Sequence, residues 1–478
     1  MFRFTTIKDY HNNLQSGQTT VVEAVRFFVE TAKADAALNA WLTIYEDEAL
    51  QAAKKLDEHT LAGQPLLPLH GVVVGLKDVI AYKNHPLSAA SKMLQNFHSI
   101  FDATVVEKLQ VAGAIILGRQ NCDEFAMGSS NENSAYGPVK NGIDPARVPG
   151  GSSGGSAVAV QMNHCMISLG SDTGGSVRQP ADFCGIVGFK PSYGRISRYG
   201  LIAYASSFDQ IGIFAKSVAD VAVVLEIIAG PDNFDSTVSE LPVPAYSVVV
   251  DEPTPKKRIA YFKDALEHPS LDPEIKAAID ATIADMQKAG YTVDAVSFDM
   301  LDLVVPTYYV LTTAEASSNL SRYDGVKFGH RSSAENIDLT ALYKNARSEG
   351  FGKEVKRRIM LGTFVLSAGY FDAYFTKAQQ IRKLLVGGAS QLFKNYDAVL
   401  LPTVPSPAFL IGDNTKDSVA MFLADIYTVY ANLVGIPAIS IPLYQHSSGL
   451  PFGLQIMCAP FEEATLLKLS TDIQKLHE

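Results

Sequence analysis

The sequence has few charged residues and few cysteines. Charged side chains make up 19% of the 478 residues and hydrophobic ones 47%, whereas soluble proteins usually carry about 25% charged residues. A long chain with so few charges predicts a large buried core and excludes disorder as the main state. The four cysteines, Cys122, Cys165, Cys184 and Cys458, form no C-x-x-C pair, so neither a disulfide framework nor a zinc knuckle is expected.

Long apolar segments are also missing. The N-terminal residues MFRFTTIKDYHNNLQSG contain no apolar stretch of the length found in a signal peptide, and no run of about 18 apolar residues occurs in the chain. We therefore expect a cytoplasmic protein without a membrane span. The balance of 40 Lys and Arg against 50 Asp and Glu gives a net charge of −10, which argues against a stand-alone nucleic-acid-binding protein, since such a protein needs a basic surface.

Alternating strand and helix patterns predict one large α/β domain. The first 65 residues or so are expected to be helical, with a capping box at Thr20 and Glu23. A strand at 258–262, a helix that begins after Asp272 and a strand at 291–293 form a β-α-β unit, which implies parallel strands. Further buried strands are predicted at 71–76, 114–118, 167–170, 398–401 and 438–443, a closing helix at 461–477, and a long surface connection at 230–255.

Two segments rich in Gly and Ser lie close together in the chain. Residues 149–156 are Pro-Gly-Gly-Ser-Ser-Gly-Gly-Ser, and residues 171–178 are Ser-Asp-Thr-Gly-Gly-Ser-Val-Arg. Such segments are most often flexible turns, but apolar sequence flanks both of these. A phosphate-binding P-loop is a second interpretation, yet Ser156 stands where that motif requires lysine. A third is the G-x-S-x-G nucleophile elbow, although none of the five histidines that follow lies in a recognisable motif.

A fourth interpretation joins both segments to Gly75-Leu76-Lys77-Asp78. Together they resemble the amidase signature family, and the similarity extends over residues 123–134, 148–156 and 170–199. The resemblance implies a Ser-Ser-Lys triad, in which Ser176 is the nucleophile, Ser152 relays its proton and Lys77 is the base, and it implies a cis peptide bond before Ser152. No metal or cofactor is expected in this chain.

The chemistry of amide hydrolysis explains why these residue types are needed. An amide is a poor electrophile with a poor leaving group, so it requires an activated nucleophile, a proton donor and stabilisation of the oxyanion. Backbone amides at Thr173, Gly174, Gly175 and Ser176 are the candidates for the oxyanion hole. Lys77 can act as a base only when neutral, and the apolar residues around it predict a pKa lowered by burial.

The resemblance also implies a fold. It is the α/β amidase-signature fold, with a large mixed, mostly parallel central sheet covered by helices on both faces. Residues 1–478 are expected to form a single amidase domain, with a helical N-terminal region at about 1–65 and the signature core at about 70–215.

Outside the shared core, the chain is similar to one group within the family, the glutamine-hydrolysing A subunits of tRNA-dependent amidotransferases. The similar segments are residues 306–309, 315–325, 348–363 and 424–428. The resemblance implies that Arg358 and Asp425 hold glutamine, with Tyr308 and Tyr309 nearby. A planar guanidinium suits the α-carboxylate of glutamine and a carboxylate suits its α-ammonium group.

This similarity further implies partner subunits. A B-type subunit would activate glutamyl-tRNA with ATP and Mg²⁺ and bind most of the charged tRNA, and a small C-type subunit would complete a heterotrimer. Two other classes remain open. A catalytically inactive scaffold should have lost a triad residue, and all three are present. The other class is a free-standing amidase for a small or lipid amide; a lipid substrate would call for an apolar channel or a membrane-binding helix and would have no use for Arg358 with Asp425.

Three positions depart from the family pattern. Val79 replaces a common Asn, which puts a hydrogen bond near Lys77 in doubt. Asp182 replaces a small residue and is interpreted as a tolerated loop change, and Tyr430 stands where a proline often occurs.

Overall fold

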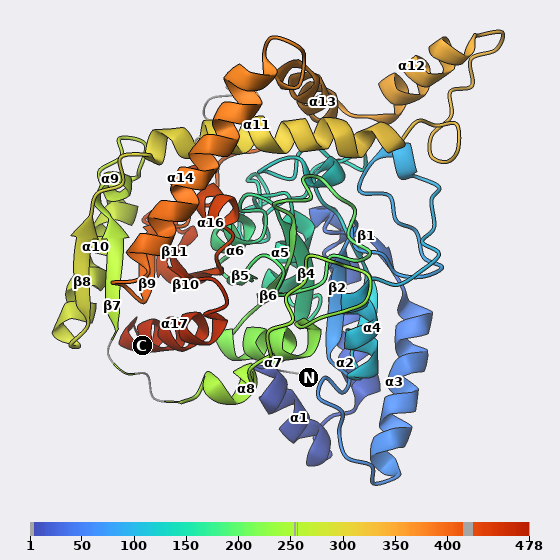
Figure 1. The fold of residues 1–478 in the computed structure, drawn as a ribbon. Coiled ribbons are helices and arrows are strands. Elements are labelled where there is room, and N and C mark those ends of the chain that lie inside the picture. The colour runs from blue at the N-terminus through green and yellow to red at the C-terminus, as the bar shows by residue number, and fades with distance from the viewer. Residues whose placement is uncertain (1–3, 253–254, 256, 414–423, 478) are drawn as a thin grey trace.

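An eleven-stranded sheet runs through the part of the chain that the computed structural model describes, residues 4–252, 255, 257–413 and 424–477 (Figure 1). In spatial order its strands are β1 (Trp41–Ile44), β3 (Ile115–Gln120), β2 (Val73–Lys77), β4 (Ile167–Asp172), β6 (Gln210–Ala215), β5 (Val187–Lys190), β10 (Ala438–Gln445), β11 (Pro451–Cys458), β9 (Ala398–Pro402), β7 (Arg258–Phe262) and β8 (Thr292–Val296). All the strands predicted from the sequence are therefore present.

The strand directions differ from the prediction. β2 pairs in parallel with β3 and β4, and β7 pairs in parallel with β8 and β9. The other six neighbouring pairs among the described residues are antiparallel. The predicted α/β fold with a large mixed sheet is confirmed, but the expectation of a mostly parallel sheet is wrong. One reason is that only residues 446–450 link β10 to β11, and so short a link permits a hairpin but no crossover.

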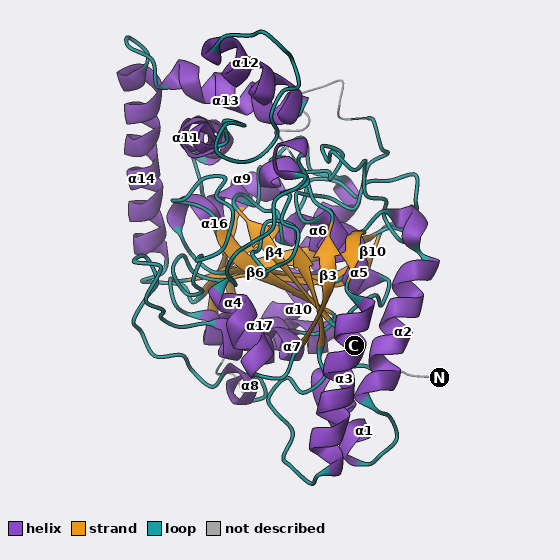
Figure 2. Ribbon diagram, turned by 90° about the vertical axis from the view of Figure 1, so that its right-hand side faces the viewer, coloured by secondary structure: helices purple, strands orange, loops and turns teal. Residues whose placement is uncertain are grey.

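Helices lie on both sides of the sheet. They are α1 (Ile7–Gln15), α2 (Val21–Ala34), α3 (Glu46–Leu61), α4 (Thr104–Val111), α5 (Gly154–Gln161), α6 (Arg178–Cys184), α7 (Val218–Ile228), α8 (Tyr246–Val249), α9 (Lys263–Leu266), α10 (Pro273–Lys288), α11 (Leu301–Asn319), α12 (Leu339–Gly350), α13 (Lys353–Val365), α14 (Lys377–Leu392), α16 (Val429–Val434) and α17 (Glu463–His477). Figure 2 shows α6 and α16 above the strands, α4, α7 and α17 beneath them, α11 to α13 farther above, and α14 upright along the left side of the molecule. None of the helices in the described ranges is long and apolar enough to cross a membrane.

Local sequence signals placed several helices correctly. The capping box at the start of α2 forms between Thr20 and Glu23. α10 begins at Pro273 after the N-cap Asp272, buries four apolar side chains on one face, and connects the parallel strands β7 and β8, as predicted. The N-terminal region is helical apart from β1, which the sequence analysis missed and which pairs with β3 at the sheet edge.

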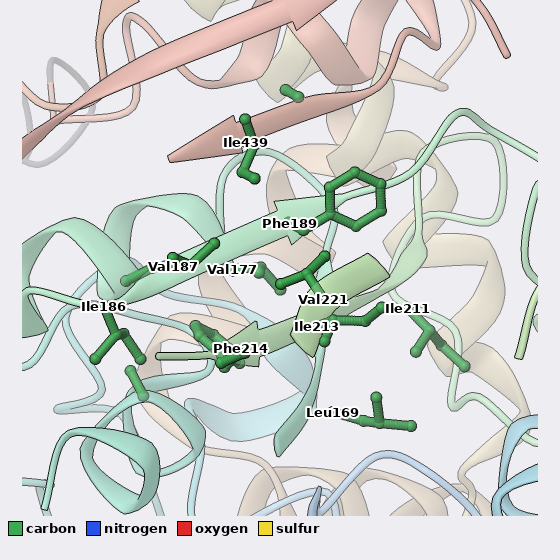
Figure 3. Close-up of a cluster of buried hydrophobic side chains, with 14 of the residues drawn as sticks. Leu169, Val177, Ile186, Val187, Phe189, Ile211, Ile213, Phe214, Val221 and Ile439 are labelled. Carbon is green, nitrogen blue, oxygen red and sulfur yellow. The ribbon is translucent and has the colours of Figure 1, made fainter. Parts of the chain in front are cut away.

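The core is dense between the central strands and the helices that cover them. Figure 3 shows side chains from β4, β5, β6 and β10 that belong to one hydrophobic core cluster. The labelled residues are at most 4% exposed: Leu169, Val177, Ile186, Val187, Phe189, Ile211, Ile213, Phe214, Val221 and Ile439. The side chains of β4 are part of this core, and the segments that follow β2 and β4 carry the residues considered next.

Candidate active site

The two Gly/Ser segments meet at the carboxyl ends of two inner strands of the sheet. β2 and β4 are parallel neighbours, so their last residues, Lys77 and Asp172, lie at the same end of these strands. Ligand-binding residues of α/β sheets typically follow the carboxyl ends of the strands. Residues 149–153 reach these strand ends just before α5, and residues 173–177 connect β4 to α6.

Lys77 lies at the centre of a group of serine hydroxyls. Its Nζ donates hydrogen bonds to Ser152 Oγ at 2.7 Å, Ser153 Oγ at 2.8 Å and Ser171 Oγ at 2.9 Å, and the side chain is fully buried. Ser152 was predicted from the sequence, whereas Ser153 and Ser171 were not. Both belong to the Gly/Ser segments, and that position was the only signal available for them.

Burial lowers the pKa of Lys77 from 10.5 to about 8. Desolvation is the dominant cause, because removing water disfavours the ammonium form. The nearby Cys122, Asp123 and Asp172 act in the opposite direction and keep the pKa from falling further. A substantial neutral fraction near neutral pH is what a lysine base requires.

The peptide bond between Gly151 and Ser152 is cis, as the family resemblance implied. Gly151 N–H donates to Gln179 Oε1 at 3.0 Å, and the Ser152 carbonyl accepts from Asp123 N–H at 3.0 Å. A Cβ atom at residue 151 would overlap the Asp123 carboxylate. Only glycine therefore fits at this position.

The Ser176 hydroxyl lies beside this group but is not bonded to it. Ser176 is 9% exposed, and its Oγ forms no hydrogen bond with any described residue. The Ser152–Ser176 hydrogen bond expected of a proton relay is therefore not formed in the described residues of this structure. The two loops are joined through their backbones instead, where Ser153 N–H donates to the Ser176 carbonyl at 3.3 Å.

Asp172 determines which backbone amides of the 173–177 segment are free to form an oxyanion hole. Its Oδ1 accepts from Gly175 N–H at 2.8 Å and its Oδ2 from Val177 N–H at 3.1 Å. The prediction that Gly175 contributes to an oxyanion hole is wrong for this arrangement, because its N–H is already bonded. The amides of Thr173, Gly174 and Ser176 donate to no group in the described residues and remain candidates.

A buried ion pair that the sequence analysis did not identify fixes this loop. Arg178 and Asp172 are both fully buried, with 2.9 Å between Arg178 Nη2 and Asp172 Oδ1. Burial alone would raise the pKa of Asp172, but the Arg178 guanidinium outweighs it and holds the pKa at about 2. Arg178 also donates to the Thr428 carbonyl and to the side chains of Asn432 and Gln455.

The four residues proposed to bind substrate come together above the same loop. Tyr308 and Tyr309 lie on α11, Arg358 lies on α13 and Asp425 precedes α16, and all are at most 7% exposed. Figure 1 shows α11 and α13 crossing above the central strands. A Cβ atom at Gly174 would come within 2.5 Å of the Tyr308 ring, so Tyr308 lies directly against the Ser176 loop.

Asp425 is held on the tyrosine side of this pocket. Its Oδ2 accepts from Ser129 Oγ at 2.9 Å and from Tyr309 OH at 3.2 Å. Burial raises its pKa to about 6, and the Ser129 hydrogen bond and the Arg358 charge limit that rise. Asp425 is therefore mostly ionised at neutral pH.

Arg358 provides the positive charge of the pocket. Its Nε donates to Glu354 Oε1 and its Nη1 to Tyr204 OH, both at 2.8 Å, and the guanidinium lies 5.4 Å from the centre of the Tyr309 ring. Within the described residues, no ion pair joins Arg358 to Asp425. Arg358 is instead ion-paired with Glu354, with 2.8 Å between Nε and Oε1, and it lies close enough to Asp425 for its charge to lower the pKa of that carboxyl.

The departures from the family pattern lie in buried surroundings. Val79 is fully buried and apolar, so its side chain cannot hydrogen-bond near Lys77. Asp182 lies in helix α6, so the prediction that it is a loop residue is wrong. Its carboxylate accepts a hydrogen bond from Gly453 N–H at 2.9 Å, and burial raises its pKa to about 7. Tyr430 packs edge-on against Phe298, with 5.1 Å between the ring centres.

Comparison with known proteins decides the family. Residues 23–467 match the family model described as Amidase. The chain belongs to the amidase family. The A subunit of the glutamyl-tRNA(Gln) amidotransferase of Koribacter versatilis is 51% identical, with 96% of each chain covered. The protein of the same name from Chlorobium luteolum is 47% identical over 99% of this chain and 97% of its own.

A solved structure supports the same assignment. The crystal structure of the A subunit of glutamyl-tRNA(Gln) amidotransferase from Thermotoga maritima superposes with a TM-score of 0.77 at 36% identity, covering 96% of this chain and 94% of that one. The resemblance to the amidase signature family and to its A-subunit group is thereby confirmed.

Proposed function

We propose that this chain is the glutamine-hydrolysing subunit of a tRNA-dependent amidotransferase. It supplies ammonia for the conversion of Glu-tRNA(Gln) to Gln-tRNA(Gln), and of Asp-tRNA(Asn) to Asn-tRNA(Asn) where the partner subunits select that substrate. The observation that carries the proposal is the placement of the buried, oppositely charged Arg358 and Asp425, which both contact Tyr309, next to the Tyr308 that lies against the Ser176 loop. The names of the similar proteins point to the same activity.

Free glutamine is a zwitterion, and the pocket matches its two charges. The Arg358 guanidinium receives the α-carboxylate and the Asp425 carboxylate receives the α-ammonium group, with Tyr309 orienting Asp425. Tyr308 lies against Gly174 and limits the space between this pocket and the nucleophile. The side-chain carboxamide of glutamine is thereby directed toward Ser176.

Ser176 Oγ attacks the carboxamide carbon to form a C–O bond. Its proton passes through Ser152 to neutral Lys77, whose Nζ is 2.7 Å from Ser152 Oγ. Catalytic hydrogen bonds often tighten only when substrate is bound, and we expect the Ser152–Ser176 hydrogen bond to form when glutamine fills the pocket. The free amides of Thr173, Gly174 and Ser176 stabilise the oxyanion.

The tetrahedral intermediate then collapses and the C–N bond breaks. Lys77 returns the proton through Ser152 to the leaving nitrogen, which departs as ammonia. Water activated by the same relay hydrolyses the acyl ester on Ser176, releasing glutamate and the free serine. Every proton in this sequence is carried by Lys77, by the two serines or by water.

The proposed function requires partners. A B-type subunit, with ATP and Mg²⁺, would consume the ammonia on charged tRNA, and a C-type subunit would complete the complex. The net charge of −10 is consistent with tRNA binding mainly on a partner. We also propose that residues 1–478 form a single domain, which the continuous sheet supports. We propose that the protein acts in the cytoplasm, where charged tRNA is used.

A panel of amides tests this proposal. The complex, and this chain alone, are given glutamine, asparagine, acetamide, an aryl amide and a fatty-acid amide, and ammonia release is measured. We expect glutamine to be preferred by at least tenfold in kcat/KM. Preference for an uncharged amide would favour the alternative, a free-standing amidase for a small amide, and would contradict the roles of Arg358 and Asp425.

A further inference from the structure

An exposed apolar surface lies where α13 ends and α14 begins. Of the 24 large hydrophobic side chains that are exposed in the described residues, nine lie between residues 360 and 386. Seven of these form what we call the corner patch: Met360, Leu361, Phe364, Leu366, Tyr370, Phe371 and Tyr374. Exposed apolar side chains scattered singly are normal, but a contiguous group marks an interaction site.

The residues that pack α13 against the rest of the protein are different from those that it contributes to the corner patch. Its buried side is formed by Val355, Arg358, Gly362 and Val365, which repeat at helical spacing. Gly362 lies so close to the Thr313 carbonyl of α11 that a Cβ atom would overlap it. The side of a surface helix that faces away from the core is normally polar, as the first half of α13 is with the exposed Lys353, Lys356 and Arg357, but its second half exposes Met360, Leu361 and Phe364.

Three aromatic rings of the corner patch contact one another at the surface. Phe364 lies 4.4 Å from Tyr370 and 5.7 Å from Tyr374 between ring centres, and the two tyrosines are 6.1 Å apart. All three are more than 40% exposed. Aromatic residues and Met are enriched at protein interfaces, where aromatic side chains often dominate the binding energy.

The charge around the corner patch is opposite to that of the chain as a whole. Between residues 353 and 383, five basic side chains are exposed against one acidic side chain, in a chain with a net charge of −10: Lys353, Lys356, Arg357, Lys377 and Lys383 against Asp372. Lys353, Lys377 and Lys383 are exposed on α13 and α14. In Figure 2, α14 lies at the outer edge of the molecule, so this basic surface is open to a partner.

We propose that the corner patch, with its basic rim, binds the ammonia-consuming subunit through an apolar surface bordered by Asp and Glu. This inference rests on the proposed function. α13 carries Arg358 on its inner side and Met360 and Phe364 on its outer side, so a partner bound here lies one helix away from the glutamine pocket. The aliphatic members Met360, Leu361 and Leu366 favour protein over RNA, because an RNA surface offers phosphates and base stacking rather than an apolar core.

Two substitutions test this surface in the assembled complex. The chain is co-expressed with its B-type and C-type partners, and the affinity for the B-type subunit is measured for M360D and F364D. The matched control is V111D, at the end of α4, where Val111 is 81% exposed. We expect M360D and F364D to weaken assembly by at least tenfold and V111D to leave it unchanged. K377E and K383E should weaken assembly more at low salt than at high salt.

Each outcome supports or overturns the proposal. Thermal unfolding of each isolated variant shows that it is folded, and M360D, at a side chain 73% exposed, should unfold at the wild-type temperature. Wild-type assembly by folded M360D and F364D would overturn the proposal. So would self-association of the wild-type chain, or tRNA binding by it, that these substitutions abolish. Glutamine hydrolysis by the wild-type complex is measured separately, so failure of the proposed function is distinguished from failure of the docking surface.

Discussion

The pKa of Lys77 leads to a quantitative prediction. With a pKa of about 8, roughly one lysine in ten is neutral at pH 7, whereas at the usual 10.5 only about three in ten thousand would be. Burial therefore raises the fraction of Lys77 in its neutral form about 300-fold. This corresponds to a change of roughly 3 kcal/mol in the free energy of deprotonating the lysine. Because the base must be neutral, the rate should increase with pH until the lysine is fully deprotonated.

The assay is the kcat for glutamine hydrolysis between pH 6 and pH 9.5. We expect kcat to rise nearly tenfold per pH unit well below the pKa of about 8, and to level off above it. Lys77→Arg should abolish hydrolysis at every pH, because a guanidinium is not deprotonated in proteins. Lys190 is a second fully buried lysine, with a pKa of about 7, but it donates to the carbonyls of Pro191 and Ile436 outside the site. Any activity left in Lys190→Gln should keep the transition near pH 8.

Two results would refute this reasoning. A kcat that is constant from pH 6.5 to pH 9 would show that Lys77 does not titrate in the catalytic step. Wild-type hydrolysis by Lys77→Arg would show that no neutral amine is needed at this position.

Two further predictions concern the charged residues around the nucleophile. Losing one partner of a buried charge contact costs about 2–5 kcal/mol. Arg358→Ala and Asp425→Ala should therefore each raise the KM for glutamine at least tenfold while ammonium-dependent amidation stays near normal. An unchanged KM in both variants would exclude these two residues from glutamine binding. Asp172→Asn should lower the free energy of unfolding by about 3–5 kcal/mol, because it leaves Arg178 buried without its counter-ion. The pKa of Asp172 is depressed, so the contribution of its carboxylate to the free energy of unfolding is complete above about pH 4 and is lost only as the pH falls through about 2. Denaturant titration at pH 7 measures this loss, and wild-type stability would refute the structural role.

The parts of the site that local sequence encodes could be predicted. Lys77, Ser152 and Ser176 each lie in a dense motif, and the structure brings both Gly/Ser segments to the end of β2. The hydrogen-bonded state of individual amides could not be predicted, because it depends on where Asp172 points after folding. Its carboxylate binds Gly175 N–H, and nothing in the segment 171–178 distinguishes that amide from its neighbours.

The same limit applies to the fold. β7, α10 and β8 were predicted because each has clear periodicity or end signals. β1 is only four residues long, too short for alternation to distinguish it from a turn between helices. Strand direction depends on how segments far apart in the chain meet, which explains why the sequence analysis overestimated the parallel pairs.

One measurement tests the central claim most directly, that Ser176 hydrolyses glutamine to supply ammonia. The complex containing Ser176→Ala is assayed for amidation of Glu-tRNA(Gln) with glutamine and, in the same preparation, with ammonium. We predict that glutamine-dependent amidation and glutamate release are abolished, while ammonium-dependent amidation stays near the wild-type rate. Wild-type glutamine hydrolysis by this variant would contradict the account.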